Sequence, residues 1–224
     1  MALGTWTLVF DPVPSLNLVL IGPPGSGKGT QAVRLARRYR VPHISTGDIL
    51  RQAVRDDTPL GRQVAATIAG GSLVGDELIS SLVAERLTRR DTDQGLLLDG
   101  FPRTLKQAHI LDKLRGHLIV VHIAASDDEI VKRLSSRRIC ESCALTQSVS
   151  GAGNGDDCPY CGGRLVRRED DDPDTVRKRL TTYAALAGPL IHLYSARPGY
   201  IEVDGLQLPD KVTADLNAAL DARR

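Results

Sequence analysis

The stretch LIGPPGSGKGTQ, residues 20–31, constrains the fold of this chain more than any other feature. It lies between an apolar run and a segment with helical spacing, and Gly22, Gly27 and Lys28 fit the pattern G-x-x-x-x-G-K. In this pattern the glycines let backbone N–H groups converge on an anion, the helix N-terminus adds partial positive charge, and the lysine reaches a terminal phosphate. A plain flexible turn is the alternative, but the lysine and the two flanks favour a phosphate-binding loop.

A second candidate for phosphate binding is GLLLDGFPRT, residues 95–104. Three leucines ending at Asp99 predict a buried strand that carries this carboxylate to the carboxyl edge of a parallel sheet, where open α/β folds bind ligands. Asp99 would hold magnesium there through water, and Arg103 offers a planar charged fork suited to phosphate, with a surface salt bridge as the alternative for Arg103. The first motif lacks a hydroxyl directly after its lysine, because Gly29 stands there and Thr30 follows.

The rest of the chain predicts an α/β fold. Its 224 residues, 42% of them hydrophobic, suffice for one sizeable core with small inserted modules. Between the strand candidates lie segments such as DELISSLVAERLTRR, which places Leu78, Leu82 and Leu87 near one helical face. Such alternation predicts a five-stranded parallel sheet flanked by helices on both faces. The candidate strands are residues 16–21, 42–44, 96–98, 118–123 and 200–203.

Residues 136–172 break this alternation and predict an inserted module with many glycines and all four cysteines. Cys140 and Cys143 form one C-x-x-C pair and Cys158 and Cys161 another, at a separation close to that of structural zinc sites. The glycines after the second pair suit a tight knuckle, and four thiolates would fill a tetrahedral site, so the zinc would be structural. Two strained disulfides, one within each C-x-x-C pair, or four reduced thiols are the alternatives, but a cytoplasmic chain rarely keeps disulfides.

Charge and the first residues limit the partners and the location of the chain. The formal net charge of +2 provides no strong positive field for nonspecific nucleic-acid binding. The start, MALGTWTLVFDPVPSLN, has no Lys or Arg, carries Asp11 and is broken by Pro12 and Pro14, so it is a poor match to a signal peptide. No uncharged apolar run reaches the roughly 20 residues that cross a bilayer. We therefore expect a cytoplasmic protein that binds neither nucleic acid nor membrane.

A third motif, STGDILR at residues 45–51, places Thr46 at a strand end and Asp48 at a helix start. Together with GPPGSGKGTQ, LVGDEL, LLLDGFPRT, the RR before the cysteine segment and DTVRKRL, it resembles the adenylate kinases, within the nucleoside monophosphate (NMP) kinases. The resemblance begins at about Leu16, so residues 1–15 lie outside it and receive no role. It implies a P-loop kinase core of residues 16–44, 75–135 and 172–224, an NMP-binding domain of residues 45–74 and a lid of residues 136–171.

The resemblance also implies a reaction: reversible transfer of the terminal phosphoryl group from Mg-ATP to AMP, giving two ADP, for adenine nucleotide homeostasis. Its transition state spreads negative charge over phosphoryl oxygens, which Lys, Arg and magnesium must stabilise. The implied catalytic residues are Lys28, Asp99, Arg103, Arg137, Arg168 and Arg179. The implied ATP site comprises Gly25, Ser26, Gly27, Lys28, Gly29, Thr30, Arg133, Arg137, Thr146, Gln147 and Gln207. The implied AMP site comprises Thr46, Arg51, Ser72, Leu73, Val74, Gly100, Arg103, Gln107, Arg168 and Arg179.

The implied roles divide six of the cations into pairs: Lys28 and Arg137 at the ATP phosphates, Arg51 and Arg103 at the AMP phosphate, and Arg168 and Arg179 bridging the two. Arg133 would lie near the adenine of ATP, which the loop VDGLQ frames with Gln207. For the lid arginines the alternative is a set of solvated helix faces paired with the acids at residues 170–172. Of these cations, Arg167, Arg177 and Lys178 fit that alternative best.

Two choices of nucleotide are less constrained. Members of the family often carry an aromatic residue and a histidine after the first cysteine pair, whereas this chain has Thr146, Gln147 and Ser148. Thr and Gln side chains suit a purine edge at the acceptor site, and the long lid favours AMP over CMP or UMP. ATP and GTP both remain open as donors, with ATP the expected one.

Two other classes explain parts of the sequence. A nucleic-acid-binding zinc ribbon would account for the cysteines and nearby arginines, but only 4% of the residues are aromatic and the phosphate motifs stay unexplained. A P-loop kinase for a sugar or a shikimate-like acid would account for the first motif alone. STGDILR and DGFPRT instead point to a second nucleotide phosphate. Each nucleotide site is complete within one chain, so we expect a monomer.

Overall fold

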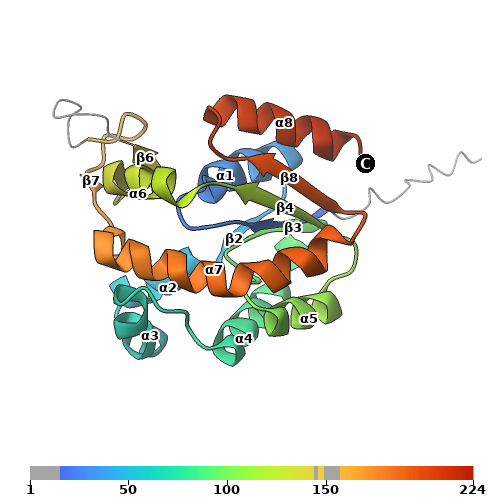
Figure 1. Ribbon diagram of the computed structural model, residues 1–224. Helices are drawn as coiled ribbons and strands as arrows, with labels where there is room; N and C mark the ends of the chain where they lie inside the picture. The colour runs from blue at the N-terminus through green and yellow to red at the C-terminus, as the bar shows by residue number, and fades with distance from the viewer. Residues whose placement is uncertain (1–15, 144–145, 149–156, 224) are drawn as a thin grey trace, which may run out of the picture.

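The computed structural model of the protein describes residues 16–143, 146–148 and 157–223 (Figure 1). Its centre is a five-stranded sheet in the order β2-β3-β1-β4-β8, and all four pairings are parallel. The predicted α/β class and sheet are therefore confirmed. The strands are β1 (Leu16–Ile21), β2 (His43–Ser45), β3 (Gly95–Asp99), β4 (Leu118–Ala124) and β8 (Tyr200–Asp204).

The strand ends differ slightly from the prediction because the ladder of backbone hydrogen bonds continues beyond the predicted runs. β2 lies one residue later than expected, since Ser45 pairs with Asp99 of β3. β4 and β8 each continue one residue further, where Ala124 pairs with Asp204. The parallel direction brings every carboxyl end to the same edge of the sheet.

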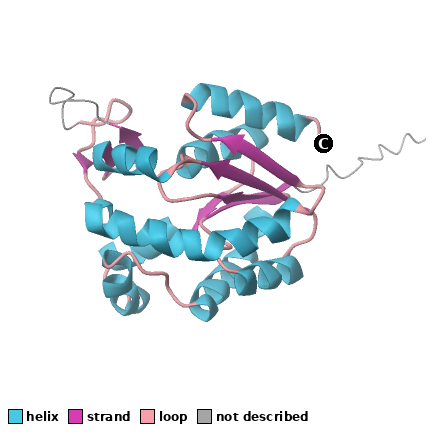
Figure 2. Cartoon of the chain, viewed as in Figure 1, coloured by secondary structure: helices cyan, strands magenta, loops and turns pink. Residues whose placement is uncertain are grey.

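Helices cover both faces of this sheet (Figure 2). Alternation along β1 directs Val19 and Ile21 to one face and Leu18 and Leu20 to the other. α1 and α8 cover the second face, while α4, α5 and α7 cover the first (Figure 1). The helices are α1 (Lys28–Tyr39), α2 (Thr46–Arg55), α3 (Pro59–Ala69), α4 (Asp76–Leu87), α5 (Leu105–Leu114), α6 (Asp127–Ser136), α7 (Pro173–Ser195) and α8 (Pro209–Asp221).

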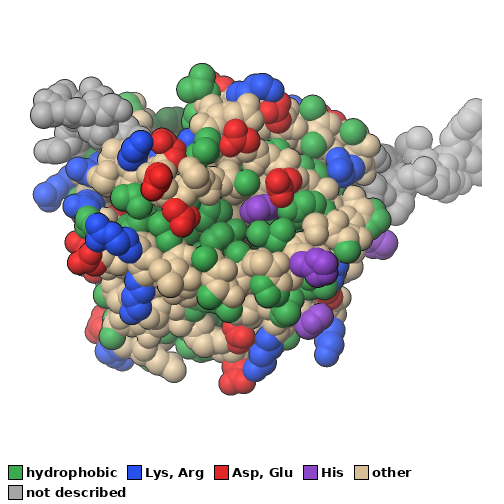
Figure 3. Space-filling model, in the orientation of Figure 1, with side chains coloured by type: hydrophobic (Ala, Val, Ile, Leu, Met, Phe, Trp, Pro, Cys, Tyr) green, Lys and Arg blue, Asp and Glu red, His purple; other side chains and the backbone are tan. Residues whose placement is uncertain are grey.

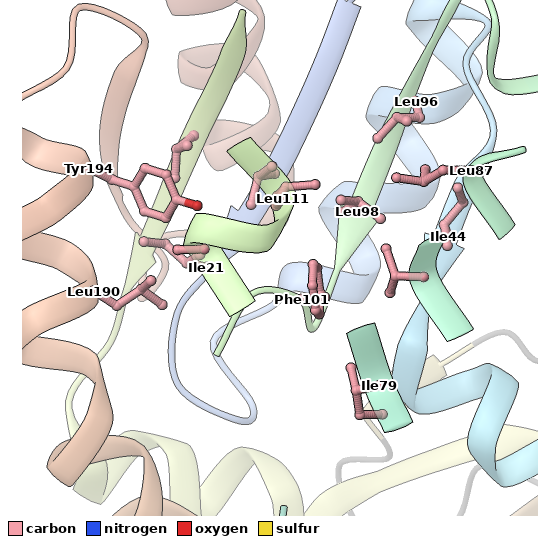
Figure 4. Close-up of a cluster of buried hydrophobic side chains, with 14 of the residues drawn as sticks. Ile21, Ile44, Ile79, Leu87, Leu96, Leu98, Phe101, Leu111, Leu190 and Tyr194 are labelled. Atoms are coloured by element: carbon pink, nitrogen blue, oxygen red, sulfur yellow. The ribbon is translucent and has the colours of Figure 1, made fainter. Parts of the chain in front are cut away.

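The first face holds the larger apolar cluster. Figure 4 shows Leu98 of β3 near Ile44 and Leu87, with Tyr194 of α7 at the other end of the cluster. Phe101, which follows β3, is fully buried in it. This packing fixes the carboxyl end of β3, where the predicted magnesium and phosphate residues lie.

The buried face of α4 is rotated from the predicted one. Ile79, Val83 and Leu87 are buried, whereas Leu78 and Leu82 are only partly buried against the same cluster. Ile79 and Val83 each follow one of the predicted residues Leu78 and Leu82, and Leu87 belongs to both sets, so the two neighbouring faces are both apolar over their first two turns. The sequence alone therefore does not decide between these two adjacent faces.

A second, antiparallel sheet of order β6-β5-β7 lies beside α6 (Figure 1). Its strands are β5 (Arg137–Cys140), β6 (Thr146–Ser148) and β7 (Leu165–Val166). The glycine-rich segment between β6 and the second cysteine pair, residues 149–156, lies outside the described residues. α7 then begins as predicted, because Asp172 accepts a hydrogen bond from the backbone N–H of Asp174 at 3.0 Å and Pro173 takes the first position.

The surface carries both signs of charge. On the face shown in Figure 3, Lys and Arg side chains alternate with Asp and Glu, which agrees with the low net charge. In the part of the chain that the structure describes, no helix combines the length and apolarity that a bilayer span requires.

Candidate functional site

The glycine-rich loop connects β1 to α1 at the carboxyl edge of the sheet. Gly22, Gly25 and Gly27 all have positive φ, at 146°, 81° and 99°. A Cβ on Gly22 would lie 2.4 Å from the carbonyl oxygen of Ile123, so only glycine allows this approach to β4. The Lys28 ammonium donates to two carbonyl oxygens of the loop, at 2.7 and 2.8 Å. The loop thus has the compact, N–H-rich shape of a phosphate cradle.

Lys28 and Asp99 form the charged floor of this edge. Burial lowers the pKa of Lys28 to about 8, although the nearby Asp99 opposes that shift. Burial would by itself raise the pKa of Asp99, but His43 and Lys28 hold it below its ordinary value. His43 Nε2 lies 3.6 Å from Asp99 Oδ2. A Cβ on Gly29 would lie 3.8 Å from the same oxygen, so the position without a hydroxyl faces this carboxylate.

The expected acceptor residues on the other side of Asp99 also lie together. Thr46 Oγ1 donates to the Gly100 carbonyl oxygen at 3.0 Å, and Arg103 Nε donates to the same oxygen at 2.8 Å. The backbone N–H of Arg103 donates to Gln107 Oε1 at 2.8 Å. Burial, followed by the charge of Arg179, lowers the pKa of Arg103 to about 10. Because burial and a neighbouring cation disfavour the charged form of Arg103, binding of an anion beside it would stabilise that charge.

Two buried acids, Asp170 and Asp171, form ion pairs with several of the predicted functional arginines. Asp170 accepts from Arg179 at 2.9 Å, and Asp171 accepts from Arg137 Nε at 2.7 Å. Arg51 of α2 lies 3.9 Å from the Asp170 carboxylate. Burial would raise the pKa of Asp170, but Arg179 and Arg51 lower it below its ordinary value. A solvated surface was the alternative for the run that holds these acids, and the structure instead buries Asp170 and Asp171 inside the cluster.

Asp48, in the first turn of α2, also belongs to this cluster. It pairs with Arg51 at 2.5 Å and lies 3.7 Å from Arg168, and burial followed by Arg51 and Arg137 lowers the pKa of Arg168 to about 10. Arg177, by contrast, pairs with Asp174 on an exposed surface. We name the set the arginine cluster: Arg51, Arg103, Arg137, Arg168 and Arg179 with Asp48, Asp170 and Asp171.

The residues expected near the ATP adenine form a second group. Arg133 of α6 donates to the carbonyl oxygens of Gly205 and Leu206, at 2.6 and 3.1 Å. Gln207 Nε2 donates to the Asp204 carbonyl oxygen in the same loop at 3.4 Å. A Cβ on Gly205 would lie 2.7 Å from the Ser26 carbonyl oxygen, so this loop packs directly on the phosphate loop.

The remaining predicted contacts lie in one strand and in the connection between α3 and α4. Thr146 and Gln147 belong to β6 and pair with residues of β5. Residues 72–74 connect α3 to α4, and the turn before them packs on α7. Gly71 has φ +68°, and a Cβ there would lie 2.9 Å from the Thr175 methyl carbon.

The four cysteines converge as predicted. All four Sγ atoms lie within 4.8 Å of one another, with Cys140 and Cys161 at 3.5 Å and Cys143 and Cys158 at 3.8 Å. Four ligands at zinc–sulfur distances would be separated by about 3.8 Å, so the donor set fits a tetrahedral metal. Gly163 supports the knuckle, because a Cβ there would lie 3.0 Å from the Cys140 sulfur.

Sequence reasoning did not assign a role to Asp170, Asp171 or His43. The run EDDD after Arg168 is the available signal, because acids between functional arginines are natural counter-ions. No comparable pattern marks His43, whose contact with Asp99 depends on the pairing of β2 with β3.

A loop of this geometry at the carboxyl edge of a parallel sheet places the chain among the P-loop kinases. A family model described as adenylate kinase matches residues 20–198. Three proteins named adenylate kinase illustrate the similarity: those of Acidothermus cellulolyticus, Exiguobacterium sibiricum and Treponema denticola. They are 46%, 45% and 42% identical to this chain over 92%, 92% and 89% of its length and 98%, 99% and 96% of their own. The chain belongs to the adenylate kinase family.

Proposed function

We propose that this chain transfers the terminal phosphoryl group of Mg-ATP to AMP, reversibly and with two ADP as products, at the arginine cluster beside the phosphate loop. Membership of the adenylate kinase family makes it a nucleoside monophosphate kinase. The observation that carries the assignment of the site is the convergence of five arginines on the edge that holds Lys28. Such a concentration of cations suits a reaction whose catalysis is mainly positioning and charge stabilisation.

On the donor side, the backbone of Gly25, Ser26, Gly27, Gly29 and Thr30 would surround the ATP phosphates. Lys28 and Arg137 would add charge to them. Arg133 and Gln207 would frame the adenine, with Thr146 and Gln147 contributing from the lid. Magnesium neutralises phosphate charge, and Asp99 is the carboxylate that would hold it through water.

On the acceptor side, Arg51 and Arg103 would bind the AMP phosphate, and Arg168 and Arg179 would bridge both nucleotides. The base would contact Thr46, Gln107, Gly100 and residues 72–74. The hydrogen bonds that join Thr46, Gly100, Arg103 and Gln107 support this grouping.

Residues 45–74 and 136–171 are the proposed moving parts, an NMP-binding domain and a lid. Closure would exclude water, which otherwise takes the phosphoryl group, and would complete the shell of arginines. The Arg168–Asp48 contact, which joins the two parts at 3.7 Å, supports this assignment.

A structural zinc ion is proposed for the lid. The alternative of C-x-x-C disulfides is not supported by the structure, in which none of the four cysteines forms a disulfide. Four reduced thiols without metal remain the competing state, and metal analysis of the purified protein separates the two. A monomer in the cytoplasm is proposed as well, since one chain supplies every residue of the proposed sites and cysteines without disulfides suit a reducing compartment.

The assignment is tested by phosphoryl transfer from Mg-ATP or Mg-GTP to AMP, CMP, UMP, GMP and shikimate. We expect diphosphate from AMP with ATP as the better donor, and loss of this activity in Arg103→Ala. Arg62→Ala is the matched control, because Arg62 is exposed and pairs with Asp57 outside the cluster. Turnover of a pyrimidine nucleotide would overturn the base choice, and the absence of transfer to every acceptor would overturn the function.

A further inference from the structure

The side-chain amide of Gln107 has two fixed partners. Gln107 Nε2 donates to Asp76 Oδ1 at 2.7 Å, and Gln107 Oε1 accepts from the Arg103 backbone N–H at 2.8 Å. Gln107 is only 2% exposed, so water offers it little alternative. Asp76 opens α4 and Gln107 lies in the first turn of α5, so the contact joins two helices that cover the same face of the sheet.

These partners allow only one orientation of the amide. A carboxylate can only accept hydrogen bonds and a backbone N–H can only donate them, so neither partner of Gln107 can switch between donor and acceptor. A flipped amide would set its oxygen against the Asp76 carboxylate and its nitrogen against the Arg103 N–H. Both buried hydrogen bonds would be lost and replaced by repulsive contacts, which is expensive in a water-poor site.

An amide fixed in one orientation can match the hydrogen-bonding edge of only one class of purine base. Among the described residues, its bonds to Asp76 and Arg103 leave one N–H and one oxygen lone pair of Gln107 for other partners. A 6-aminopurine offers a donor at N6 and an acceptor at N1, whereas a 6-oxopurine offers an acceptor at O6 and a donor at N1. The two bases therefore require opposite orientations of the same amide.

We propose that Asp76 is a positioning residue that sets the acceptor specificity: by locking the Gln107 amide, it makes the site accept a 6-aminopurine monophosphate and reject a 6-oxopurine monophosphate. The inference rests on the proposed function, which places Gln107 at the acceptor base. A site with committed buried donors and acceptors rejects a mismatched partner strongly, because the mismatch leaves these groups unpaired. Asp76 would thus determine the discrimination without touching the base itself, through its hydrogen bond to Gln107.

A purely structural role is the competing explanation. Asp76 Oδ2 also accepts from the Thr104 hydroxyl at 3.0 Å, and Thr104 caps α5. The chain supplies a matched control one residue further along, where Glu77 pairs with Lys106 at 2.8 Å and joins the same two helices without touching Gln107. Glu77→Gln therefore removes an inter-helix carboxylate contact and leaves the amide lock intact.

The experiment compares kcat/KM for AMP and for inosine monophosphate, which differs from AMP at positions 6 and 1 alone. In the wild type we expect AMP to be strongly preferred. Asp76→Asn keeps the shape but lets position 76 donate as well as accept, so the preference should fall by about tenfold, the scale of one lost buried hydrogen bond. KM for Mg-ATP should not move, and Glu77→Gln should retain the wild-type preference.

A second variant keeps the test decisive if the first alters folding. Asp76→Asn combined with Gln107→Glu exchanges the acid and the amide, so the base would meet acceptors only. An edge of acceptors alone matches each base at one position, so the preference for AMP over inosine monophosphate should fall further than in Asp76→Asn. The melting temperature should stay close to that of Glu77→Gln. A wild type that transfers to AMP but does not discriminate, or variants that keep full discrimination, would overturn this inference alone. A wild type with no transfer to AMP would overturn the proposed function instead.

Discussion

The five-stranded core sheet and the three-stranded sheet of the proposed lid differ in what holds them together. The core has five strands between two apolar clusters, and all six residues of β1 are buried. The described part of the lid has a single small cluster of Cys140, Cys158 and Leu165. Burial of apolar surface can stabilise the first region but not the second, since small units need metals or disulfides as well. The lid should therefore lose order first.

The cations of the two regions differ in the same way. Lys28 is held by carbonyl oxygens of a glycine loop that is wedged against β4. Arg137 of the lid is held by the Asp171 carboxylate, which lies outside the lid sheet in the turn before α7. The core thus holds its cation in a rigid frame, whereas the proposed lid holds its cation in an ion pair, which the proposed function would have a nucleotide phosphate replace.

The largest expected effect tests whether the rigid cation is indispensable. Lys28→Ala removes the buried ammonium aimed at the phosphate loop, and kcat/KM should fall by about a thousandfold, as for other lost groups that stabilise transition-state charge. Initial rates measured from ATP and AMP will show this. Lys132→Ala, at an exposed position of α6, should retain full activity. A fall of less than tenfold in Lys28→Ala would contradict the assigned role.

The next effect separates the two kinds of packing. Leu98→Ala opens a cavity at a fully buried site of β3 and should lower the free energy of unfolding by about 3 kcal/mol. Leu165→Ala should leave the main urea transition unchanged and accelerate hydrogen exchange in β5 and β7 only. If Leu165→Ala shifted the main transition as much as Leu98→Ala, the two regions would unfold as one unit.

Metal removal should affect the lid alone. Because Cys140 and Cys158, two of the four metal-binding candidates, make up most of its apolar cluster, chelation should lower the melting temperature of the lid before that of the core. Calorimetry combined with hydrogen exchange would resolve the two transitions, with zinc re-addition as the control. A single unchanged transition after verified metal removal would count against a metal-dependent lid.

The smallest effect concerns pH and the core cation. Burial lowers the pKa of Lys28 to about 8, so kcat/KM for Mg-ATP should decline above pH 8, by at most tenfold per pH unit. The same shift has a defined sign for stability: the folded state binds this proton less tightly than the unfolded chain, so the contribution of Lys28 to stability rises from about pH 8 toward 10.5. A rate that stays level to pH 9.5 would contradict this expectation.

The sequence predicted the parts of the molecule that depend on local chemistry. Buried parallel strands are continuous apolar runs, so Leu16–Ile21 was predicted with its observed bounds. Glycine and lysine spacing identified the phosphate loop, and paired C-x-x-C motifs identified the cysteine cluster. In each case the residues that cooperate lie close together in the chain or share a strict spacing.

The parts that depend on tertiary contacts were not predictable in this way. Asp170 is charged and lies in an acidic run, which is typical of a solvated surface, yet four segments surround it with arginines. The buried face of α4 is similar, because Leu78 and Leu82 are as apolar as Ile79 and Val83, and only the packing against neighbouring elements decides which pair is fully buried. A residue pattern indicates which contacts a side chain can form, while the fold determines which residues it actually contacts.

If nucleotides bind at the arginine cluster, as proposed, its acids make binding an exchange of one anion for another. Arg137, Arg179 and Arg51 face Asp171, Asp170 and Asp48, so the cations are already compensated. A phosphate that enters must displace a carboxylate, and few counter-ions from the buffer are released in the process. The affinity for nucleotides should consequently depend less on ionic strength than the number of arginines suggests.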